Sequence, residues 1–254
     1  MEFWSEEGIV LQARPFGETG TVLHCLTRSY GNHAGLVHGG QSRRKAALLE
    51  LGNQLNLNWS ARISDNLGSY NCELVESRAA LYLSDQPRLL ALQAFCATLA
   101  LLCPEREPMP FVYDAAQSWL SLLESAHWAQ TLVRFELGLL TALGYHLELE
   151  RCAVTNQEHD LCFVSPKSGR AVSRAVAQPY QERLLQLPAF LTPSSNALES
   201  DDEWKSQAAQ GLKLTGYFLE KHLFSSLNRP LPEARWALYN LLTRNESPRN
   251  SAFI

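Results

Sequence analysis

Residues 132–152, LVRFELGLLTALGYHLELERC, divide the chain into a front half and a back half. The apolar residues of this stretch recur at helical spacing over about three turns. They are Leu132, Phe135, Leu139, Leu140 and Leu143. Gly144 follows where a helix C-cap glycine belongs, because glycine adopts the left-handed conformation without steric penalty. The stretch therefore predicts a core helix that stops at Gly144, followed by an insertion that begins at Cys152.

The composition describes a folded globular protein. A chain of 254 residues is long enough for one large or two ordinary domains. Hydrophobic residues make up 46% of it and charged residues 19%, which excludes a disordered chain. The net charge of −4 argues against a uniformly basic nucleic-acid binder. It still allows a local basic face, because a patch sets the field that attracts a polyanion.

The cysteines and the N-terminus indicate a reduced, cytoplasmic protein. The chain has six cysteines and no CxxC pair, which is the usage of a cytosolic protein with small buried thiols. Glu2, Glu6 and Glu7 stand where a secretory signal would need positive charge. The most apolar run, residues 89–103, is shorter than the roughly 20 residues that span a bilayer. We therefore expect a buried helix there and no contact with membranes.

The first 77 residues are rich in strand signals. Short apolar and β-branched runs alternate with turn signals that contain glycine, proline or asparagine. The expected strands are residues 8–11, 21–26, 34–38, 55–63 and 70–75. Five short strands suit a small closed barrel, because closure removes edges that such a sheet could not protect. The five-stranded oligonucleotide-binding barrel, or OB-fold, is the predicted fold, and its usual ligand is single-stranded nucleic acid.

Charge is concentrated in this front segment. Residues 8–49 hold five basic residues and one acid, Glu18, which gives +4 and leaves −8 for the rest of the chain. The predicted DNA-binding residues are Arg14, Arg28, Arg43, Arg44 and Lys45. The last three follow residues 39–42, which are expected to form a flexible loop that a DNA backbone could approach. The alternative is that these three cations form only a solvated turn.

Two aromatic residues, Phe16 and Tyr30, lie at predicted turns of the barrel. Each could stack on a nucleic-acid base, an interaction worth roughly 1–3 kcal/mol. The alternative is that both rings belong to the core of the barrel.

The periodicity becomes helical from Arg78 onward. Ser84 or Asp85 can cap the first helix, with Pro87 tolerated in its first turn. A proline-rich break at residues 104–110 ends that helix. Further helices are expected at residues 111–123, 132–143, 179–191 and 233–242, with another, capped by Ser200 or Asp201, that runs past Leu223. A loop is expected at residues 192–200 and a frayed tail at residues 245–254.

Four stretches resemble the RecO family of bacterial recombination mediators. They are residues 8–31 (GIVLQARPFGETGTVLHCLTRSYG), 35–45 (GLVHGGQSRRK), 134–154 (RFELGLLTALGYHLELERCAV) and 163–172 (FVSPKSGRAV). The resemblance implies an α+β fold with an N-terminal OB-fold barrel at residues 1–77. It also implies a helical domain at residues 78–147 and 179–254, interrupted by a zinc-finger-like insertion at residues 148–178.

The resemblance also implies a role without catalysis. RecO proteins bind single- and double-stranded DNA, anneal complementary strands and contact the C-terminal tail of the single-strand-binding protein. With the partner RecR they help the RecA recombinase load onto coated single strands. A cytoplasmic, nucleoid-associated location is therefore expected.

The zinc motif of the family is broken in this chain. Many members bind zinc through CxxC…CxxC, and only the first position, Cys152, remains. The other three positions hold Thr155, Ser173 and Val176. Structural zinc needs four nitrogen or sulfur ligands, and the nearby His159 and Cys162 have no usual spacing for one. We therefore predict no metal, with the insertion held together by Leu161, Phe163, Val164 and Val172.

No motif for catalysis is complete. The sequence has no GxSxG elbow, no GxxxxGK[ST] phosphate loop and no HExxH pair. His146 and Glu148 resemble half of a deaminase signature, but the downstream Pro-Cys-x-x-Cys is missing. The sequence therefore predicts no enzyme, no cofactor and no small-molecule substrate.

Two functions remain after this exclusion. The first is a DNA-binding and annealing mediator that acts through the basic front segment. The second is a protein–protein adaptor that acts mainly through the helical domain and binds DNA weakly. The acidic remainder of the chain motivates the adaptor, because a groove between helices can bind a peptide.

Overall fold

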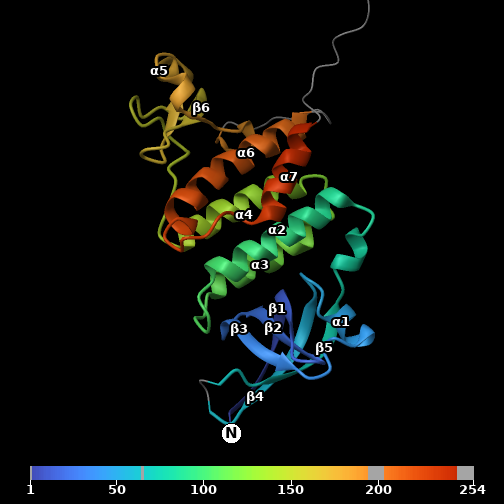
Figure 1. The fold of residues 1–254 in the computed structure, drawn as a ribbon. Coiled ribbons are helices and arrows are strands. Elements are labelled where there is room, and N and C mark those ends of the chain that lie inside the picture. Colours follow the sequence, from blue (N-terminus) through green and yellow to red (C-terminus); the bar gives the residue numbers. More distant parts are fainter. Residues whose placement is uncertain (1, 64–65, 194–202, 245–254) are drawn as a thin grey trace, which may run out of the picture. The chain divides into compact units, whose positions relative to one another are not determined.

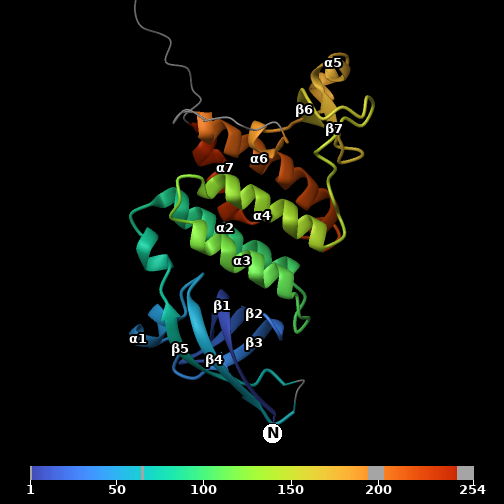
Figure 2. The same cartoon turned by 180° about the vertical axis from the view of Figure 1, so that it is seen from behind.

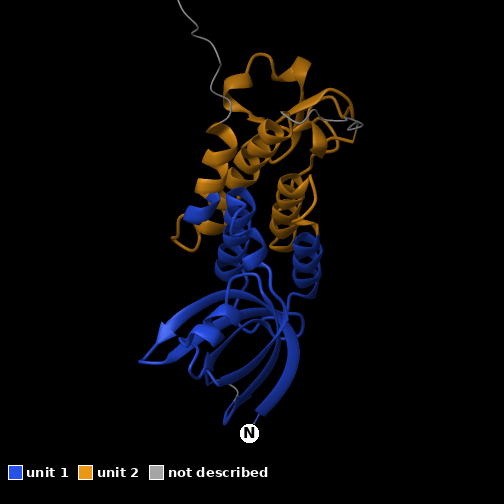
Figure 3. Ribbon diagram, turned by 90° about the vertical axis from the view of Figure 1, so that its right-hand side faces the viewer, with its two compact units in different colours: residues 1–121, 232–235 blue, residues 122–231, 236–254 orange. Residues whose placement is uncertain are grey.

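The computed structural model describes residues 2–63, 66–193 and 203–244 (Figure 1). The chain separates into two compact units, which Figure 3 shows in different colours. Unit 1 comprises residues 1–121 and 232–235, and unit 2 comprises residues 122–231 and 236–254. The strand-rich segment lies in unit 1, and the insertion that begins at Cys152 lies in unit 2. The domain boundaries expected from the sequence stay a prediction.

Unit 1 contains a closed barrel of five strands in the order β1-β2-β3-β5-β4 (Figure 1). The strands are β1 (Glu2–Phe16), β2 (Gly20–Thr27), β3 (Gly31–Val37), β4 (Gln54–Ala61) and β5 (Ser69–Glu76). All neighbouring pairs are antiparallel except β3 and β5, which meet in parallel at Leu36 and Ser69. The prediction of a five-stranded OB-fold barrel followed by helices is confirmed.

The first strand is much longer than the four residues predicted. Its first half pairs with β4, from Glu2 opposite Ala61, and its second half pairs with β2, up to Phe16 opposite Gly20. A β-bulge after Val10 lets the strand bend from one neighbour to the other. The sequence signal is weak outside residues 8–11 because these long-range pairings, and not local propensity, hold the ends of the strand.

Residues 39–42, where a loop was expected, form turns and a bend, whereas the basic run that follows begins a short helix that was not predicted. Helix α1 spans Arg43–Leu48. The carbonyls of Ala47 and Leu48 accept hydrogen bonds from the side-chain amide of Asn53, each at 3.1 Å. Leu49, directly after the helix, is buried in the barrel core. These contacts fix the helix, although six residues alone are too few for a stable one.

Two longer helices, α2 (Gln86–Leu102) and α3 (Pro110–Leu122), complete unit 1 after the short turn η1 (Ala79–Tyr82). As predicted, Asp85 caps α2 by accepting a hydrogen bond from the Arg88 backbone N–H. The ring of Phe95 in α2 stacks on that of Trp119 in α3 at 4.3 Å between centroids. Both helices lie within a turn of their predicted bounds, on either side of the proline-rich break.

Helices also form most of unit 2. Helix α4 (Trp128–Ala142) buries the predicted apolar stripe, and Gly144 has a φ of +92°, the left-handed conformation expected of the C-cap. Helix α6 (Glu203–Leu219) packs beside α4. Between them the buried Thr215 hydroxyl donates a hydrogen bond to the buried Glu136 carboxylate. α6 continues as the π-helical turn η4 (Glu220–Phe224). The last helix of the described residues, α7 (Glu233–Thr243), belongs to unit 2 from Trp236 onward.

The insertion in unit 2 has a three-stranded sheet in the order β7-β6-β8. Its strands are β6 (Leu161–Val164), β7 (Ala171–Ser173) and β8 (Leu185–Gln186), and a single helical turn, α5 (Arg174–Ala177), follows β7. The four apolar residues expected to hold the insertion together are all buried, namely Leu161, Phe163, Val164 and Val172. This part of the prediction is confirmed.

The predicted helix at residues 179–191 is absent, and that prediction was wrong. The segment forms two single turns, η2 (Gln181–Arg183) and η3 (Ala189–Leu191), on either side of β8. Leu185 and Gln186 instead pair with Val164 and Phe163 of β6. Long-range strand pairing therefore overrides the local helical pattern. The predicted cap at Ser200 or Asp201, most of the loop at residues 192–200 and the tail at residues 245–254 lie outside the described residues.

Candidate nucleic-acid interface

Arg14 is the first of the predicted contacts along the barrel. It lies near the end of β1, opposite Val22 of β2, and its side chain is exposed. The turn between the two strands follows Phe16 and contains Gly17, which has a φ of +60°. Glu18, the acid of the basic segment, is exposed in the same turn.

Gln41 ties the start of the basic run to this turn. Its backbone N–H donates to the Thr19 carbonyl at 3.1 Å. Its side-chain amide donates to the carbonyls of Gly17 at 3.2 Å and Gly20 at 2.8 Å. Because Gln41 lies two residues before the start of α1, these bonds bring the start of α1 to the end of the barrel where the β1–β2 turn lies.

We call the exposed residues Arg14, Arg43, Arg44 and Lys45 the basic end of the barrel. The buried Leu49 holds α1 against the barrel core, which leaves the basic side chains of the helix in solvent. The Lys45 ammonium also donates to the carbonyl of His38 at 2.6 Å. These four exposed cations come from two segments of the chain that Gln41 links at one end of the barrel, and a concentration of cations attracts phosphate groups.

Arg28, the fifth predicted contact, lies apart from the basic end. It follows β2, whereas the β1–β2 turn precedes that strand, so Arg28 and the turn are at opposite ends of β2. Its guanidinium makes two hydrogen bonds to the Asp114 carboxylate, both at 3.0 Å. The hydrogen bond and charge of Asp114 raise the pKa of Arg28, and the same bond lowers the pKa of Asp114.

The two turn aromatics have different surroundings. Tyr30 stacks on Trp4 with 4.2 Å between ring centroids and 12° between ring planes. Trp4 in turn contacts the rings of His33, Trp59 and Tyr70 inside the barrel. Phe16 is 55% exposed at the end of β1. The ring of Tyr30 is therefore an edge of the core, and the ring of Phe16 is open to solvent.

Sequence reasoning missed the residues that position α1. Gln41 and Asn53 carry no charge and belong to no periodic pattern, so neither was predicted to matter. The available signal was the pair Gly52-Asn53 after the basic run, because glycine and asparagine are typical of a helix C-terminus. Asn53 also accepts a hydrogen bond from the Arg78 backbone N–H at 2.9 Å, so it links α1 to the end of β5 as well.

The broken cysteine motif forms a hydrogen-bonded pair in unit 2. The sulfur of Cys152 accepts a hydrogen bond from the Ser173 backbone N–H at 3.4 Å and lies 3.4 Å from the Ser173 hydroxyl. Burial raises the pKa of the Cys152 thiol, but hydrogen bonds from Ser173 and Thr155 outweigh it and lower the pKa to about 6. The Ser173 hydroxyl is thus used within the protein.

The proposed substitutes for zinc ligands do not converge on Cys152. Cys162 instead accepts a hydrogen bond from the Arg174 guanidinium at 3.1 Å and lies 3.6 Å from the Asp160 carboxylate. Among the described residues no group of three or more His, Cys, Asp or Glu side chains could hold a metal ion. The residues of this motif therefore do not fit structural zinc, which requires four such ligands.

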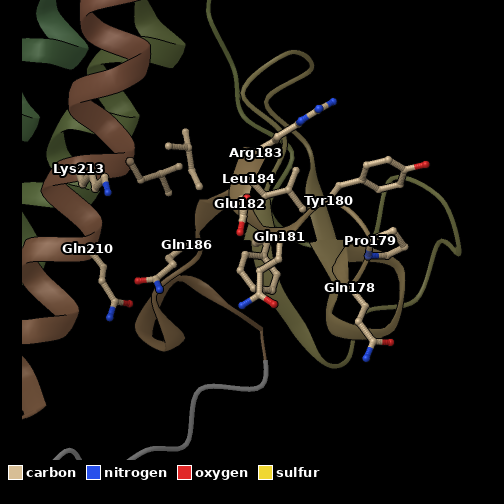
Figure 4. A pocket seen from close by; sticks show the side chains of 13 residues that line it. Gln178, Pro179, Tyr180, Gln181, Glu182, Arg183, Leu184, Gln186, Gln210 and Lys213 are labelled. Atoms are coloured by element: carbon tan, nitrogen blue, oxygen red, sulfur yellow. The ribbon is translucent and has the colours of Figure 1, made fainter.

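Unit 2 has a pocket of about 830 Å³ between the insertion and α6 (Figure 4). Residues 178–186 form one wall, and Gln210, Lys213 and Leu214 of α6 form the other. The lining carries the amides of Gln178, Gln181, Gln186 and Gln210, the cations Arg183 and Lys213, and the acid Glu182. A polar, open pocket of this kind is more typical of a contact surface for a peptide than of an apolar small-molecule site.

Within the described part of the chain, no helix has the length and apolarity needed to cross a bilayer.

The barrel, the helices and the insertion define a two-part protein with an N-terminal OB-fold. The chain belongs to the RecO family of DNA repair proteins. The family model "Recombination protein O N terminal" matches residues 1–78, and "Recombination protein O C terminal" matches residues 83–230.

Relatives from several bacteria are similar to this chain over nearly its whole length. A protein named "DNA repair protein RecO" from Rhodospirillum centenum is 43% identical over 234 residues, which cover 91% of each chain. The protein of the same name from Rhodospirillum rubrum is 42% identical over 247 residues, or 95% of this chain and 96% of the relative. A third, from a Ruegeria species, is 43% identical and covers 95% of this chain and 98% of its own.

Proposed function

We propose that this protein is a recombination mediator that binds single- and double-stranded DNA and anneals complementary strands. The observation that carries the proposal is the basic end of the barrel, where Gln41, just before the cations of α1, is hydrogen-bonded to the β1–β2 turn that follows Arg14. Membership of the RecO family supports it. Arg28 is a further proposed contact, available to DNA when it is released from Asp114.

The mechanism follows from charge. Two complementary strands repel each other through their phosphates, and cations that bind one strand reduce that repulsion. Phosphate contacts carry no sequence information, so binding is expected on any sequence. Each contact releases a condensed counterion, which makes the affinity fall linearly with salt on a logarithmic scale. No nucleotide hydrolysis is needed, and the proposal includes no catalysis, no cofactor and no small-molecule substrate.

The test is binding of a labelled single-stranded oligonucleotide, followed by fluorescence polarisation across a salt series. Annealing of two complementary strands is measured in parallel. We expect a log Kd that rises linearly with log salt, together with faster annealing. An absence of binding at low salt would contradict the proposal.

We further propose that the protein acts with RecR, contacts the C-terminal tail of the single-strand-binding protein and helps load RecA onto coated single strands. Membership of the family supports the proposal of these partners and of a cytoplasmic, nucleoid-associated location. In unit 2 the pocket beside α6 carries Arg183 and Lys213, which suit a peptide with acidic residues.

The second candidate function is an adaptor that works mainly through such protein contacts and binds DNA weakly. The observation that favours it is the same polar pocket in unit 2. Pull-down of purified RecR and of the single-strand-binding protein at low and high salt separates the two functions. Partner binding that persists at high salt, together with weak DNA binding at low salt, would favour the adaptor.

A further inference from the structure

Phe16 is a large apolar side chain in an exposed place. The residue is 55% exposed at the last position of β1. A single exposed apolar residue is normal on a protein surface and carries no meaning by itself. The position of Phe16 relative to the basic end of the barrel is what gives it a role.

The ring stands beside the proposed phosphate contacts. Phe16 is two residues from Arg14 on the same strand. The next residue, Gly17, accepts a hydrogen bond from Gln41, which lies two residues before Arg43. A Cβ atom built on Gly17 would have no atom within 4 Å apart from its chain neighbours, so the turn that follows Phe16 is open at this point.

Tyr30, the other turn aromatic, is a poorer candidate for contact with DNA. One face of its ring is covered by Trp4 at 4.2 Å, and the residue follows β2 at the end of that strand where Arg28 pairs with Asp114. Within the described part of the chain, Phe16 makes no contact with another aromatic ring. Phe16 is thus an uncovered aromatic ring located at the basic end.

We infer that Phe16 is a stacking platform for an unpaired base, and that it makes the basic end of the barrel prefer single strands over duplex. The inference rests on the proposed function. Phosphates are present in both forms of DNA, so the cations alone do not distinguish them strongly. In a duplex the faces of the bases are already stacked, whereas a single strand can place a base on an aromatic ring.

Stacking on Phe16 also fits annealing. A strand that is held by its phosphates and one base keeps its remaining bases free to pair. Pairing then withdraws the stacked base from the ring, which leaves the duplex product held by the cations alone. The product is therefore bound more weakly than the substrate, and this difference favours its release.

The experiment compares the full-length wild-type protein with Phe16→Ala, Phe16→Trp and the control Phe3→Ala. Phe3 is 67% exposed and lies near the other end of the same strand. Fluorescence polarisation measures binding to three labelled probes of equal length: a single strand, a hairpin duplex and a single strand with abasic sites. Thermal midpoints are measured for all four proteins.

We expect Phe16→Ala to weaken binding of the single strand by about 5- to 150-fold, which corresponds to a loss of roughly 1–3 kcal/mol for one stacked base. Binding of the duplex and of the abasic strand should change little. The slope of log Kd against log salt should stay the same, because the number of phosphate contacts is unchanged. Phe16→Trp should retain single-strand binding, and Phe3→Ala should match the wild type.

Two results would overturn the inference. Equal single-strand binding by wild type and Phe16→Ala would remove Phe16 from the site. Equal losses on single strand, duplex and abasic strand would show that the ring only supports the turn. Either result leaves the proposed function intact as long as the wild type binds DNA with a salt slope. A wild type that binds no probe would instead contradict the proposed function itself.

Discussion

Arg28, in the turn after β2, forms a two-point ion pair with Asp114 of α3, with both nitrogen–oxygen distances at 3.0 Å. About half of each side chain remains exposed. The pair therefore holds the guanidinium near a carboxylate while leaving it within reach of a phosphate. A phosphate that binds Arg28 must compete with Asp114.

Removing the competitor should release this cation for DNA. We expect Asp114→Asn to steepen the slope of log Kd against log salt for a single strand by about 0.7, the contribution of one phosphate contact. Arg28→Ala alone should change the slope little, and Arg28→Ala added to Asp114→Asn should restore the wild-type slope. Fluorescence polarisation of the four proteins forms a double-mutant cycle. Equal slopes in all four proteins would mean that Arg28 does not contact DNA, whether Asp114 is present or replaced.

Gly31 should be essential for the stability of unit 1. Its φ is +64°, and a Cβ atom at this position would lie 2.0 Å from the carbonyl oxygen of Glu107. Gly39 is the matched control, with a φ of +65° and no atom within 4 Å of the same position. We expect Gly39→Ala to lower the free energy of unfolding by about 1–2 kcal/mol, and Gly31→Ala by about 2–5 kcal/mol. Urea unfolding measures both; similar losses would mean that the backbone beside Gly31 yields freely.

His33 should make the barrel less stable in acid. It is 4% exposed among the rings of Trp4, Trp59 and Tyr70. Burial, helped by the charge of Arg106, lowers the pKa of His33 from 6.5 to about 4. The folded protein thus binds this proton less readily than the unfolded chain. The contribution of neutral His33 to the free energy of unfolding is complete above pH 6.5 and is lost as the pH falls towards 4.

The measurement is the free energy of unfolding between pH 4 and 7 for the wild type and for His33→Gln. We expect the wild type to lose roughly 1–3 kcal/mol more than the variant over this range. The variant will be less stable at pH 7 because it disrupts the aromatic cluster, so the pH dependence is the informative quantity. Parallel curves would show that His33 does not titrate differently in the folded and unfolded states.

The insertion should fold without zinc. Its apolar core is Phe163, Val172 and Ala177, and the sulfur of Cys152 is satisfied by Ser173. We expect the same thermal midpoint for protein refolded with a chelator and with added zinc. A large drop in the thermal midpoint under the chelator would contradict this prediction. Recovery of the midpoint with added zinc would indicate zinc ligands outside the described residues.

The sequence was sufficient for elements that have a strong local signal. Helix α4 with its stop at Gly144, the Asp85 cap of α2 and the apolar core of the insertion were all predicted from periodicity and capping rules. Helix α1 and the strand β8 were missed. Both are short and depend on partners distant in sequence, namely Asn53 for α1 and β6 for β8.

The candidate site likewise combines residues that the sequence identifies with contacts that only the structure shows. Composition alone identified the five cations, because a count of charge needs no structure. It could not show that Gln41 brings α1 to the β1–β2 turn, or that Arg28 pairs with Asp114, which lies 86 residues further along the chain. The stack between Trp4 and Tyr30 is likewise a product of the closed barrel and left no periodic trace in the sequence.

The most direct test of the basic end is the salt slope of single-strand binding after charge reversal of α1. The variant carries Arg43→Glu, Arg44→Glu and Lys45→Glu. The control carries the same change in charge on exposed residues of unit 2, with Lys167→Glu, Arg183→Glu and Lys213→Glu. We expect the α1 variant to bind much more weakly and to flatten the slope by about 2, which is three contacts at ~0.7 each, while the control keeps the wild-type slope. Identical slopes and affinities for the α1 variant, the control and the wild type would contradict the assignment of this surface to DNA.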